Sequence, residues 1–256
     1  GLTKSQNNIL ISKKVKVIKC VKNGNASIIR YGDMLKFLNK NSYKQVLSCD
    51  GGDIIFQKDI SHLFSENKKS FRGVCEDISN IEMFSIFMDN INHNLRREIL
   101  KKLKGKSIIN AGFIIAPTNK LKGLCKKVNK LIINKNKFGA DQILVNYELY
   151  REGFVSLDKG FNFIPTTMYD KFKIKKGVFY RNSEVIPVVH NAGRTSFFRV
   201  ITNFGYGAEY NRLNVWMYYL LRITYRFIIW LNLLLNRFSR IFHLQPSGKF
   251  FPLFNY

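Results

Sequence analysis

The chain has 256 residues and a formal net charge of +25 at pH 7, a length that suits one large domain or one domain with an appendage. The charge predicts an anionic partner, such as a phosphorylated substrate, a nucleic acid or an anionic membrane. The four cysteines form no Cys-x-x-Cys pair, and neither a zinc-finger spacing nor an RNA-recognition signature is present. This argues against a zinc site, a disulfide framework and a nucleic-acid partner, and it favours a reducing, cytoplasmic compartment. The polar opening residues lack the apolar core of a signal peptide.

The first third of the chain predicts a β-α-β unit. β-Branched and alternating residues predict strands at Leu10-Ile11 and at residues 15–18, and Asn23-Gly24-Asn25 predicts a turn. A helical pattern follows over residues 27–38, and residues 46–49 predict a buried strand. Asp50 and Asp53 would then lie at the carboxyl end of the second strand, where open α/β sheets bind ligands.

The acid pair Asp50-Gly51-Gly52-Asp53 is the most informative stretch of the sequence. Two carboxylates separated only by glycines suit a hard divalent cation, which usually keeps water and substrate phosphates as further ligands. We therefore expect Mg²⁺ or Mn²⁺ and a diphosphate-bearing substrate. Asp-Gly-Gly-Asp is also ordinary turn chemistry, so a solvated loop is the alternative.

The elements after the acid pair alternate between strands and helices. Short strands are predicted at residues 71–76, 154–157, 161–165 and 185–190, and helices at residues 78–103, 119–133 and from 141 onwards. Residues 107–117 are apolar on both sides of Asn110-Ala111-Gly112, which predicts a strand, a tight turn and a second strand. The small residues would allow a ligand or backbone to approach closely.

Two further polar residues have both a functional and a structural interpretation. Asp141 would lie in the first turn of its helix, where it either stabilises the helix dipole or contacts a ligand. His190 follows Val188-Val189 as Asp50 follows its own strand, so we favour a ligand role over a purely structural one.

Taken together, these motifs resemble those of nucleotide-sugar glycosyltransferases with a GT-A type fold. Their order and spacing are similar to those of the group that contains glycogenin and lipopolysaccharide galactosyltransferases, glycosyltransferase family 8, over roughly residues 15–207. The matching elements are Arg30-Tyr31, the acid pair as a variant of Asp-x-Asp, Asn110-Ala111-Gly112, Asp141-Gln142 with Asn146 four residues on, and His190.

The resemblance implies a fold, a reaction and residue roles. It implies an α/β fold with a GT-A, Rossmann-like mixed sheet flanked by helices over residues 1–207, followed by an amphipathic helical tail over residues 208–256. The reaction would be metal-dependent transfer of a sugar from a nucleotide diphosphate, most simply a UDP-sugar, to a glycan or lipid-linked acceptor. Mn²⁺ or Mg²⁺ would be held by Asp50, Asp53 and His190, and the donor would be bound by Arg30, Tyr31, Asp50, Asn110, Ala111, Gly112, Asn191 and Gly193.

The resemblance favours a reaction that retains the configuration of the sugar carbon. It would place Asp141 and Gln142 near that carbon. An inverting enzyme would need a carboxylate base, for which Asp141 or Glu76 would serve. The sequence departs from the family pattern in two ways. Two residues separate the acids where the family has one, so Asp50 would reach the metal through water or contact ribose instead. The family also has a longer portion before this strand, so we expect an abbreviated base-binding pocket.

The C-terminal part from residue 211 to 242 is rich in leucine and aromatic residues. At about 100° per residue, its five arginines fall within an arc of about 80°; they are Arg212, Arg222, Arg226, Arg237 and Arg240. Arginines interrupt the apolar run too often for a membrane span. We expect a helix in the interface of an anionic membrane with arginines towards the headgroups, which would make the protein peripheral at the inner face of the cell membrane. The alternative is a pair of helices packed on the catalytic domain or on another subunit.

Two other functions compete with a glycosyltransferase. A nucleotidyltransferase or another phosphate-handling α/β enzyme would need only the acid pair. This alternative explains Asn110-Ala111-Gly112 and Asp141-Gln142 less well. A basic membrane-binding or nucleic-acid-binding protein without catalysis would use the acids only as turn residues.

Overall fold

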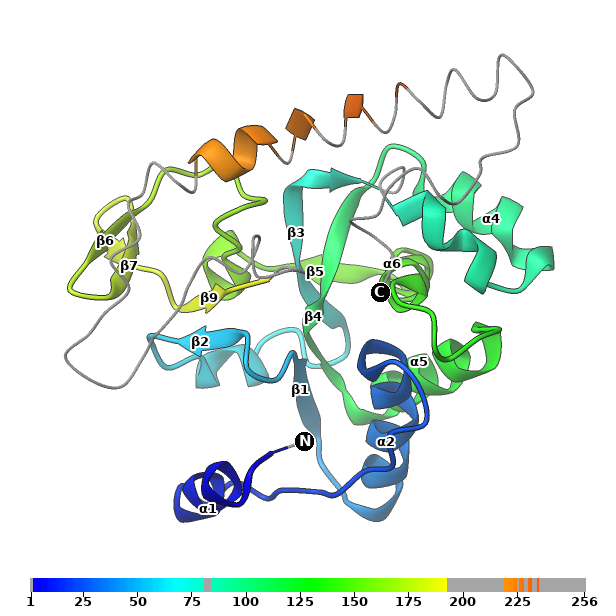
Figure 1. Cartoon of the computed structure of the whole chain (residues 1–256), viewed down its shortest axis with the longest axis horizontal. Coiled ribbons are helices and arrows are strands. Elements are labelled where there is room, and N and C mark those ends of the chain that lie inside the picture. Colours follow the sequence, from blue (N-terminus) through cyan, green and yellow to red (C-terminus); the bar gives the residue numbers. More distant parts are fainter. Residues whose placement is uncertain are drawn as a thin grey trace.

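The structure, a computed structural model, describes residues 2–80 and 84–192 together with residues 219–224, 226, 227, 230, 231 and 234. The chain is an α/β protein built on a mixed four-stranded sheet (Figure 1). The strands of this sheet are β1 (Gln45–Cys49), β3 (Phe71–Asn80), β4 (Ser107–Pro117) and β5 (Phe154–Ser156), in the order β1-β4-β3-β5. Strand β4 is antiparallel to β1 and β3, and β3 is parallel to β5.

Helices cover one face of this sheet, on the right in Figure 1. They are α2 (Ala26–Lys40), α4 (His93–Leu103), α5 (Thr118–Leu131) and α6 (Ala140–Glu152). Apolar residues at helical spacing, such as Leu121, Leu124 and Val128 of α5, are buried with Ile114 and Ala116 of β4 in the largest core cluster. Burial of this face fixes α2 and α6 beside the sheet.

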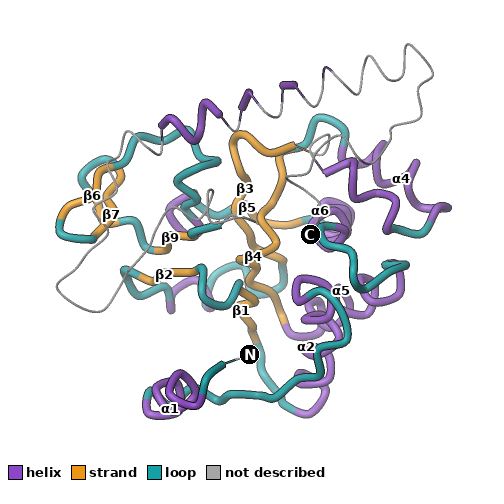
Figure 2. The backbone as a smooth tube through the Cα atoms, viewed as in Figure 1, coloured by secondary structure: helices purple, strands orange, loops and turns teal. Residues whose placement is uncertain are grey.

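Short strands, single helical turns and loops cover the other face of the sheet (Figure 2). The elements there are β2 (Ile54–Phe56), η1 (Ser61–Phe64), η3 (Lys159–Asn162), β6 (Lys173–Lys175), β7 (Val178–Arg181), β8 (Glu184–Val185) and β9 (Val188–His190). Strands β2 and β9 pair antiparallel, with Ile54 opposite His190. This pairing brings the segment after the acid pair next to a histidine far away in the sequence.

The β-α-β unit predicted for the start of the chain is wrong. Leu10 and Ile11 belong to α1 (Lys4–Ser12), whose Thr3 cap and Gln6 side chain form a reciprocal capping box. Residues 15–18 form no strand, and in the described part of the chain no strand precedes β1. The acids nevertheless follow the carboxyl end of a strand, as predicted.

The strand, turn and strand predicted for residues 107–117 is also wrong, because β4 runs through Asn110-Ala111-Gly112 as one strand. The irregularity appears instead in its pairing. The β3–β4 register shifts between the Gly73–Ile114 pair and the Cys75–Ile109 pair. A local departure from regular pairing of this kind often turns side chains towards a site.

Most other predicted elements agree in type with the structure. The helices α2, α5 and α6 and the strands β1, β3, β5 and β9 lie where the sequence predicts them. Strand β3 extends to Asn80, so residues 78–80 are not helical as predicted, and residues 81–83 lie outside the described part of the chain. After them the structure describes η2 (Ser85–Asn90) and α4. The segment 161–165 forms no strand and contributes only an isolated bridge between Phe163 and Val189.

The tail residues that the structure describes are helical and contact the domain. Arg222 is buried, and its guanidinium donates to the carbonyl oxygens of Pro165 at 2.6 Å and Asp170 at 3.0 Å. The Arg226 guanidinium lies over the Tyr169 ring at 4.1 Å. Arg222 therefore does not face lipid headgroups, which corrects that part of the arginine prediction, while Arg212, Arg237 and Arg240 lie outside the described residues. In the part of the chain that the structure describes, no helix is long and apolar enough to cross a bilayer.

The four cysteines differ in exposure. Cys20 and Cys49 are exposed, Cys75 is partly buried and Cys125 is buried, and none forms a disulfide. Burial raises the pKa of Cys125 to about 12. Cys49 is the last residue of β1 and directly precedes Asp50.

Candidate functional site

Asp50, Asp53 and His190 converge at the end of β1. One ligand atom from each lies within 4.8 Å of the others, a separation that one cation can span. Asp50 follows β1, Asp53 precedes β2, and His190 ends β9. The β2–β9 ladder joins the last two, because Ile54 pairs with His190 and the Asn191 amide donates to the Asp53 carbonyl oxygen at 2.8 Å.

The two glycines of the acid pair let the chain reverse between β1 and β2. Gly52 has φ +85°, a conformation that costs glycine little and other residues more. The Asp50 amide donates to the Gly112 carbonyl oxygen at 3.0 Å, so the turn starts from a fixed point on β4. The resulting turn directs both carboxylates to the same place.

His190 is fully buried and leaves one ring nitrogen without a hydrogen bond. Its Nε2 lies 3.6 Å from the Asp50 Oδ2 atom, and its Nδ1 lies 2.9 Å from the Asn162 Oδ1 atom. A buried polar atom without a partner is unfavourable unless a ligand satisfies it. Nε2 is therefore the ring atom that a bound cation would contact.

Electrostatics keep the Asp50 carboxylate ionised. Burial alone would raise its pKa, but the adjacent His190 ring and the charge of Arg30 outweigh burial and lower the pKa to about 2. The Arg30 Nη1 atom forms an ion pair with the Asp50 Oδ1 atom. Asp50 is thus charged at neutral pH, as a metal ligand must be.

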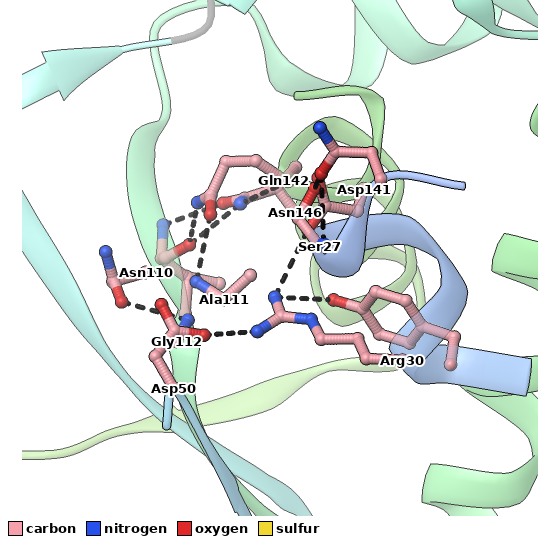
Figure 3. Close-up of polar contacts among 12 residues, drawn as sticks. Ser27, Arg30, Asp50, Asn110, Ala111, Gly112, Asp141, Gln142 and Asn146 are labelled. Carbon is pink, nitrogen blue, oxygen red and sulfur yellow. Dashed lines mark hydrogen bonds and ion pairs between the residues drawn. The ribbon is translucent and has the colours of Figure 1, made fainter. Parts of the chain in front are cut away.

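Arg30 also joins this carboxylate to the helix side of the site. Figure 3 shows its guanidinium between Asp50 and Asp141, with Nη2 3.2 Å from the Asp141 Oδ2 atom and 3.2 Å from the Tyr31 hydroxyl. Asp141 is buried in the first turn of α6, as predicted, and burial raises its pKa while Arg30 opposes the rise. Burial also raises the pKa of the Tyr31 hydroxyl. In this structure Asp141 is the counter-ion of Arg30.

Gln142 and Asn146 hold the irregular part of β4, also seen in Figure 3. The Gln142 Oε1 atom accepts from the Ala111 amide at 3.0 Å, and its Nε2 donates to the Ile109 carbonyl oxygen at 2.5 Å. Asn146 binds the same residue through both of its polar atoms, at 2.7 Å to the Ile109 amide and 2.8 Å to its carbonyl oxygen. These side chains bond β4 backbone groups that lie beyond the end of its pairing with β1 at Cys49–Phe113. Gln142 thus has a supporting role, and its predicted place beside the reacting carbon stays a prediction.

A second group of contacts joins β3 and β4 next to Asp50. It consists of Glu76, Asn110 and Gly112. The Asn110 side chain donates to Glu76 at 2.8 Å and accepts from the Gly112 amide at 2.9 Å. Gly112 faces the acids directly, because a Cβ atom there would lie 2.5 Å from the Asp50 Oδ2 atom and 2.7 Å from the His190 Cε1 atom. Two protein side chains therefore approach Gly112 closely, and the approach of a ligand or backbone predicted there stays a prediction.

The remaining predicted donor residues follow β9. Asn191 is partly buried and its backbone is tied to Asp53. Gly193 lies outside the described residues.

The donor set fits a small divalent cation. Two carboxylates and one imidazole suit Mn²⁺, which accepts both oxygen and nitrogen ligands, and Mg²⁺ more weakly because it prefers oxygen. The unpartnered Nε2 atom of His190 supports this fit. A cation held by three protein groups would have further positions for substrate oxygens.

Sequence reasoning missed Asn162, which contacts His190, and it gave no structural role to Asn146. Asn162 is fully buried at the end of η3. A polar residue between Phe161 and Phe163 was the one available signal in the sequence, since amides are seldom fully buried without a specific partner.

Neither a scan against protein-family models nor a search of curated proteins finds a match to this chain.

Proposed function

We propose that this protein is a metal-dependent glycosyltransferase with a GT-A type catalytic domain, which transfers a sugar from a nucleotide diphosphate to a glycan or lipid-linked acceptor. The observation that carries the proposal is the convergence of Asp50, Asp53 and His190 after the end of β1. A mixed α/β sheet with charged residues at a strand end is compatible with nucleotide binding. The resemblance in motif order adds the sugar donor to this chemistry.

In this proposal the three ligands hold Mn²⁺ or Mg²⁺, which when bound neutralises the diphosphate leaving group. Arg30 keeps Asp50 ionised, and its planar guanidinium is suited to exchange that carboxylate for a donor phosphate. The Asp141 carboxylate forms an ion pair with the Arg30 guanidinium and thereby holds it in place. Glu76, bonded to Asn110, is the carboxylate we assign as base if the reaction inverts configuration, but we favour retention, in which the departing diphosphate takes the acceptor proton.

A donor-binding experiment tests the proposal. Purified protein is screened with nucleotide sugars by thermal stabilisation, with and without Mn²⁺, and slow donor hydrolysis is followed by release of UDP. We expect a UDP-sugar to stabilise the wild-type protein only with Mn²⁺, and Asp53→Asn to abolish the effect. Asp59→Asn is the matched control, because Asp59 is an exposed acid that only caps the Ser61 turn.

The outcomes separate the competing functions. A nucleotidyltransferase would bind a nucleoside triphosphate in preference and release pyrophosphate. A protein without catalysis would show neither Mn²⁺-dependent binding nor hydrolysis. Equal donor binding by wild type and Asp53→Asn would contradict the proposed role of the acid pair.

We also propose that the protein acts at the inner face of an anionic membrane, with the tail helix as its contact. Four large apolar side chains are 55–64% exposed at spacings of three and four residues; they are Leu220, Ile223, Phe227 and Trp230. On a helix this spacing places them on one face, whereas Leu221 and Arg222 are buried. We call these four side chains the apolar stripe.

Exposed lysines lie in the segment that the tail helix contacts. Phe172 touches Arg222 and Tyr219, and Lys171, Lys173, Lys175 and Lys176 around it are exposed. An apolar stripe beside a basic patch suits a surface of anionic lipid. The proposed orientation keeps the expected membrane contact of the apolar side chains but differs from the sequence expectation in placing Arg222 towards the domain.

Co-sedimentation with vesicles that contain anionic lipid tests this orientation. The triple variant Ile223→Ser, Phe227→Ser, Trp230→Ser should lower the bound fraction by about tenfold or more, since burial of each large apolar side chain contributes about 1.5–3 kcal/mol. The control Ile9→Ser, Ile11→Ser removes similarly exposed apolar side chains from α1. Equal loss in both variants would contradict a specific role for the apolar stripe.

A further inference from the structure

A buried amide holds the histidine of the cation cluster. His190 and Asn162 are both fully buried, and 2.9 Å separates the His190 Nδ1 atom from the Asn162 Oδ1 atom. An amide oxygen only accepts hydrogen bonds. The contact therefore requires the proton of a neutral imidazole to lie on Nδ1, which leaves the lone pair on Nε2.

The backbone around Asn162 allows it little freedom. It ends the single turn η3, whose start is capped by the Asp158 side chain at 2.8 Å from the Gly160 amide. The next residue, Phe163, donates to the Val188 carbonyl oxygen at 2.9 Å and accepts from the His190 amide at 2.8 Å. Asn162 and His190 are thus joined by the backbone as well as by their side chains.

The orientation of the Asn162 amide has a cost that a purely structural role does not explain. Its Nδ2 atom is buried and has no hydrogen-bond partner, and such an arrangement is unfavourable. The orphaned Nε2 of His190 is the second buried polar atom of this pair without a partner. A ligand at Nε2 would remove the second cost. The first follows from turning the amide oxygen, and not its nitrogen, towards Nδ1, which keeps Nε2 free for that ligand.

We propose that Asn162 is a positioning residue that holds His190 in the tautomer whose Nε2 lone pair faces the Asp50 and Asp53 carboxylates. This inference rests on the proposed cation site and adds to it the residue that prepares the ring. Metal-bound histidines commonly donate their other nitrogen to such a partner, which fixes tautomer and ring orientation. Asn162 itself touches neither cation nor substrate.

Mn²⁺ affinity of the full chain, measured by electron paramagnetic resonance of free Mn²⁺, tests the proposal. Asn162→Ala should weaken binding by about 10- to 100-fold. Asn162→Asp keeps an acceptor for Nδ1–H and should stay within about threefold of the wild type. The matched control is Asn90→Ala, because Asn90 is an equally buried amide that bonds the 134–137 loop; its Mn²⁺ affinity should not change.

The tautomer of His190 can also be measured directly in the metal-free wild-type protein. A purely structural role of Asn162 would not determine which ring nitrogen carries the proton. Long-range ¹H–¹⁵N spectra, with His190 assigned by comparison with His190→Gln, should show Nδ1 protonated in the wild type and in Asn162→Asp. A proton on Nε2 in the wild type would overturn the proposal, even if Asn162→Ala does not fold.

Failure of this inference and failure of the proposed function look different. If His190→Gln and Asp53→Asn weaken Mn²⁺ binding and Asn162→Ala does not, only the role of Asn162 is overturned. If all three bind Mn²⁺ like the wild type, the cation site itself is overturned.

Discussion

The two sides of the candidate site differ in whether their buried polar groups have partners within the chain. On the β2–β9 side, Asp50, Asp53 and His190 bring ligand atoms together and leave the His190 Nε2 atom unpartnered. On the helix side, the carboxylate of Asp141 and the amides of Gln142 and Asn146 have partners within the chain. The first arrangement leaves a buried ring nitrogen without a partner, whereas these carboxylate and amide groups of the second all have partners.

This difference predicts which residues bind a cation and which support the fold. Buried polar groups that are satisfied by the protein contribute to its stability, whereas an unsatisfied one leaves a position that a water molecule or a ligand can fill. Arg30 lies at the boundary, since it pairs with Asp50 on one side and Asp141 on the other. Changes on the helix side should therefore lower stability, and changes on the β2–β9 side should lower cation affinity.

The largest expected effect is that of Arg30→Gln, which removes the cation from between two carboxylates. Loss of one partner of a buried ion pair costs about 3–5 kcal/mol of unfolding free energy. Burial already raises the pKa of Asp141 against the opposing effect of Arg30, so the variant should raise it further. Because the folded state then binds a proton that the unfolded state does not, the unfolding free energy of the variant should increase as pH falls from 7 towards 4. Urea unfolding across this range measures it.

The double variant Arg30→Gln, Asp141→Asn controls for loss of the arginine packing. It leaves no unpaired charge at Asp141, so most of the lost stability should return. A double variant that is no more stable than Arg30→Gln would show that the ion pair with Asp141 has little importance.

Asn146→Leu tests the supporting role of the helix side. The variant leaves the Ile109 amide without its partner and removes one of two donors to the Ile109 carbonyl oxygen, and a buried unsatisfied group costs about 1–3 kcal/mol. We expect a lower melting temperature and an unchanged Mn²⁺ affinity of the folded protein. A large loss of affinity at unchanged stability would instead place Asn146 among the binding residues.

Gly112→Ala should have the smallest effect on stability and a specific one on the cation site. The added Cβ would press on Asp50 and His190, so we expect Mn²⁺ affinity to fall by about tenfold, equivalent to ~1.4 kcal/mol. Gly51→Ala is the matched control, because a Cβ there meets nothing within 4 Å. Calorimetric titration of both variants with Mn²⁺ gives the comparison, and equal affinities would argue against crowding at Gly112.

Local patterns predict much of this fold. The helices α2, α5 and α6 follow from apolar spacing, and β1 and β9 from short β-branched or apolar runs. The failures have a physical cause. Residues 10 and 11 have strand-like side chains, but Thr3 and Gln6 cap a helix around them. Asn110-Ala111-Gly112 resembles a turn, yet β4 stays extended because side chains of α6 satisfy its backbone.

The convergence of Asp50, Asp53 and His190 was also predictable, because each of them lies at or next to the end of a β-strand, and a cation there stays a prediction. The role of Asn162 was not, since its contact with His190 depends on the packing of η3 against β9. Asp141 pairs with Arg30 of α2, and Gln142 bonds the backbone of β4. Both contacts depend on distances between α2, α6 and β4 that the local sequence does not encode.

The exposed thiol of Cys49 places a natural labelling point directly before Asp50. With Cys20 replaced by serine, Cys49 becomes the one exposed thiol of the chain, because Cys75 is partly buried and Cys125 is buried. A fluorophore attached there would lie within quenching range of paramagnetic Mn²⁺. Such a label would report Mn²⁺ binding by quenching, and a signal that Mn²⁺ does not quench would count against the proposed cation site.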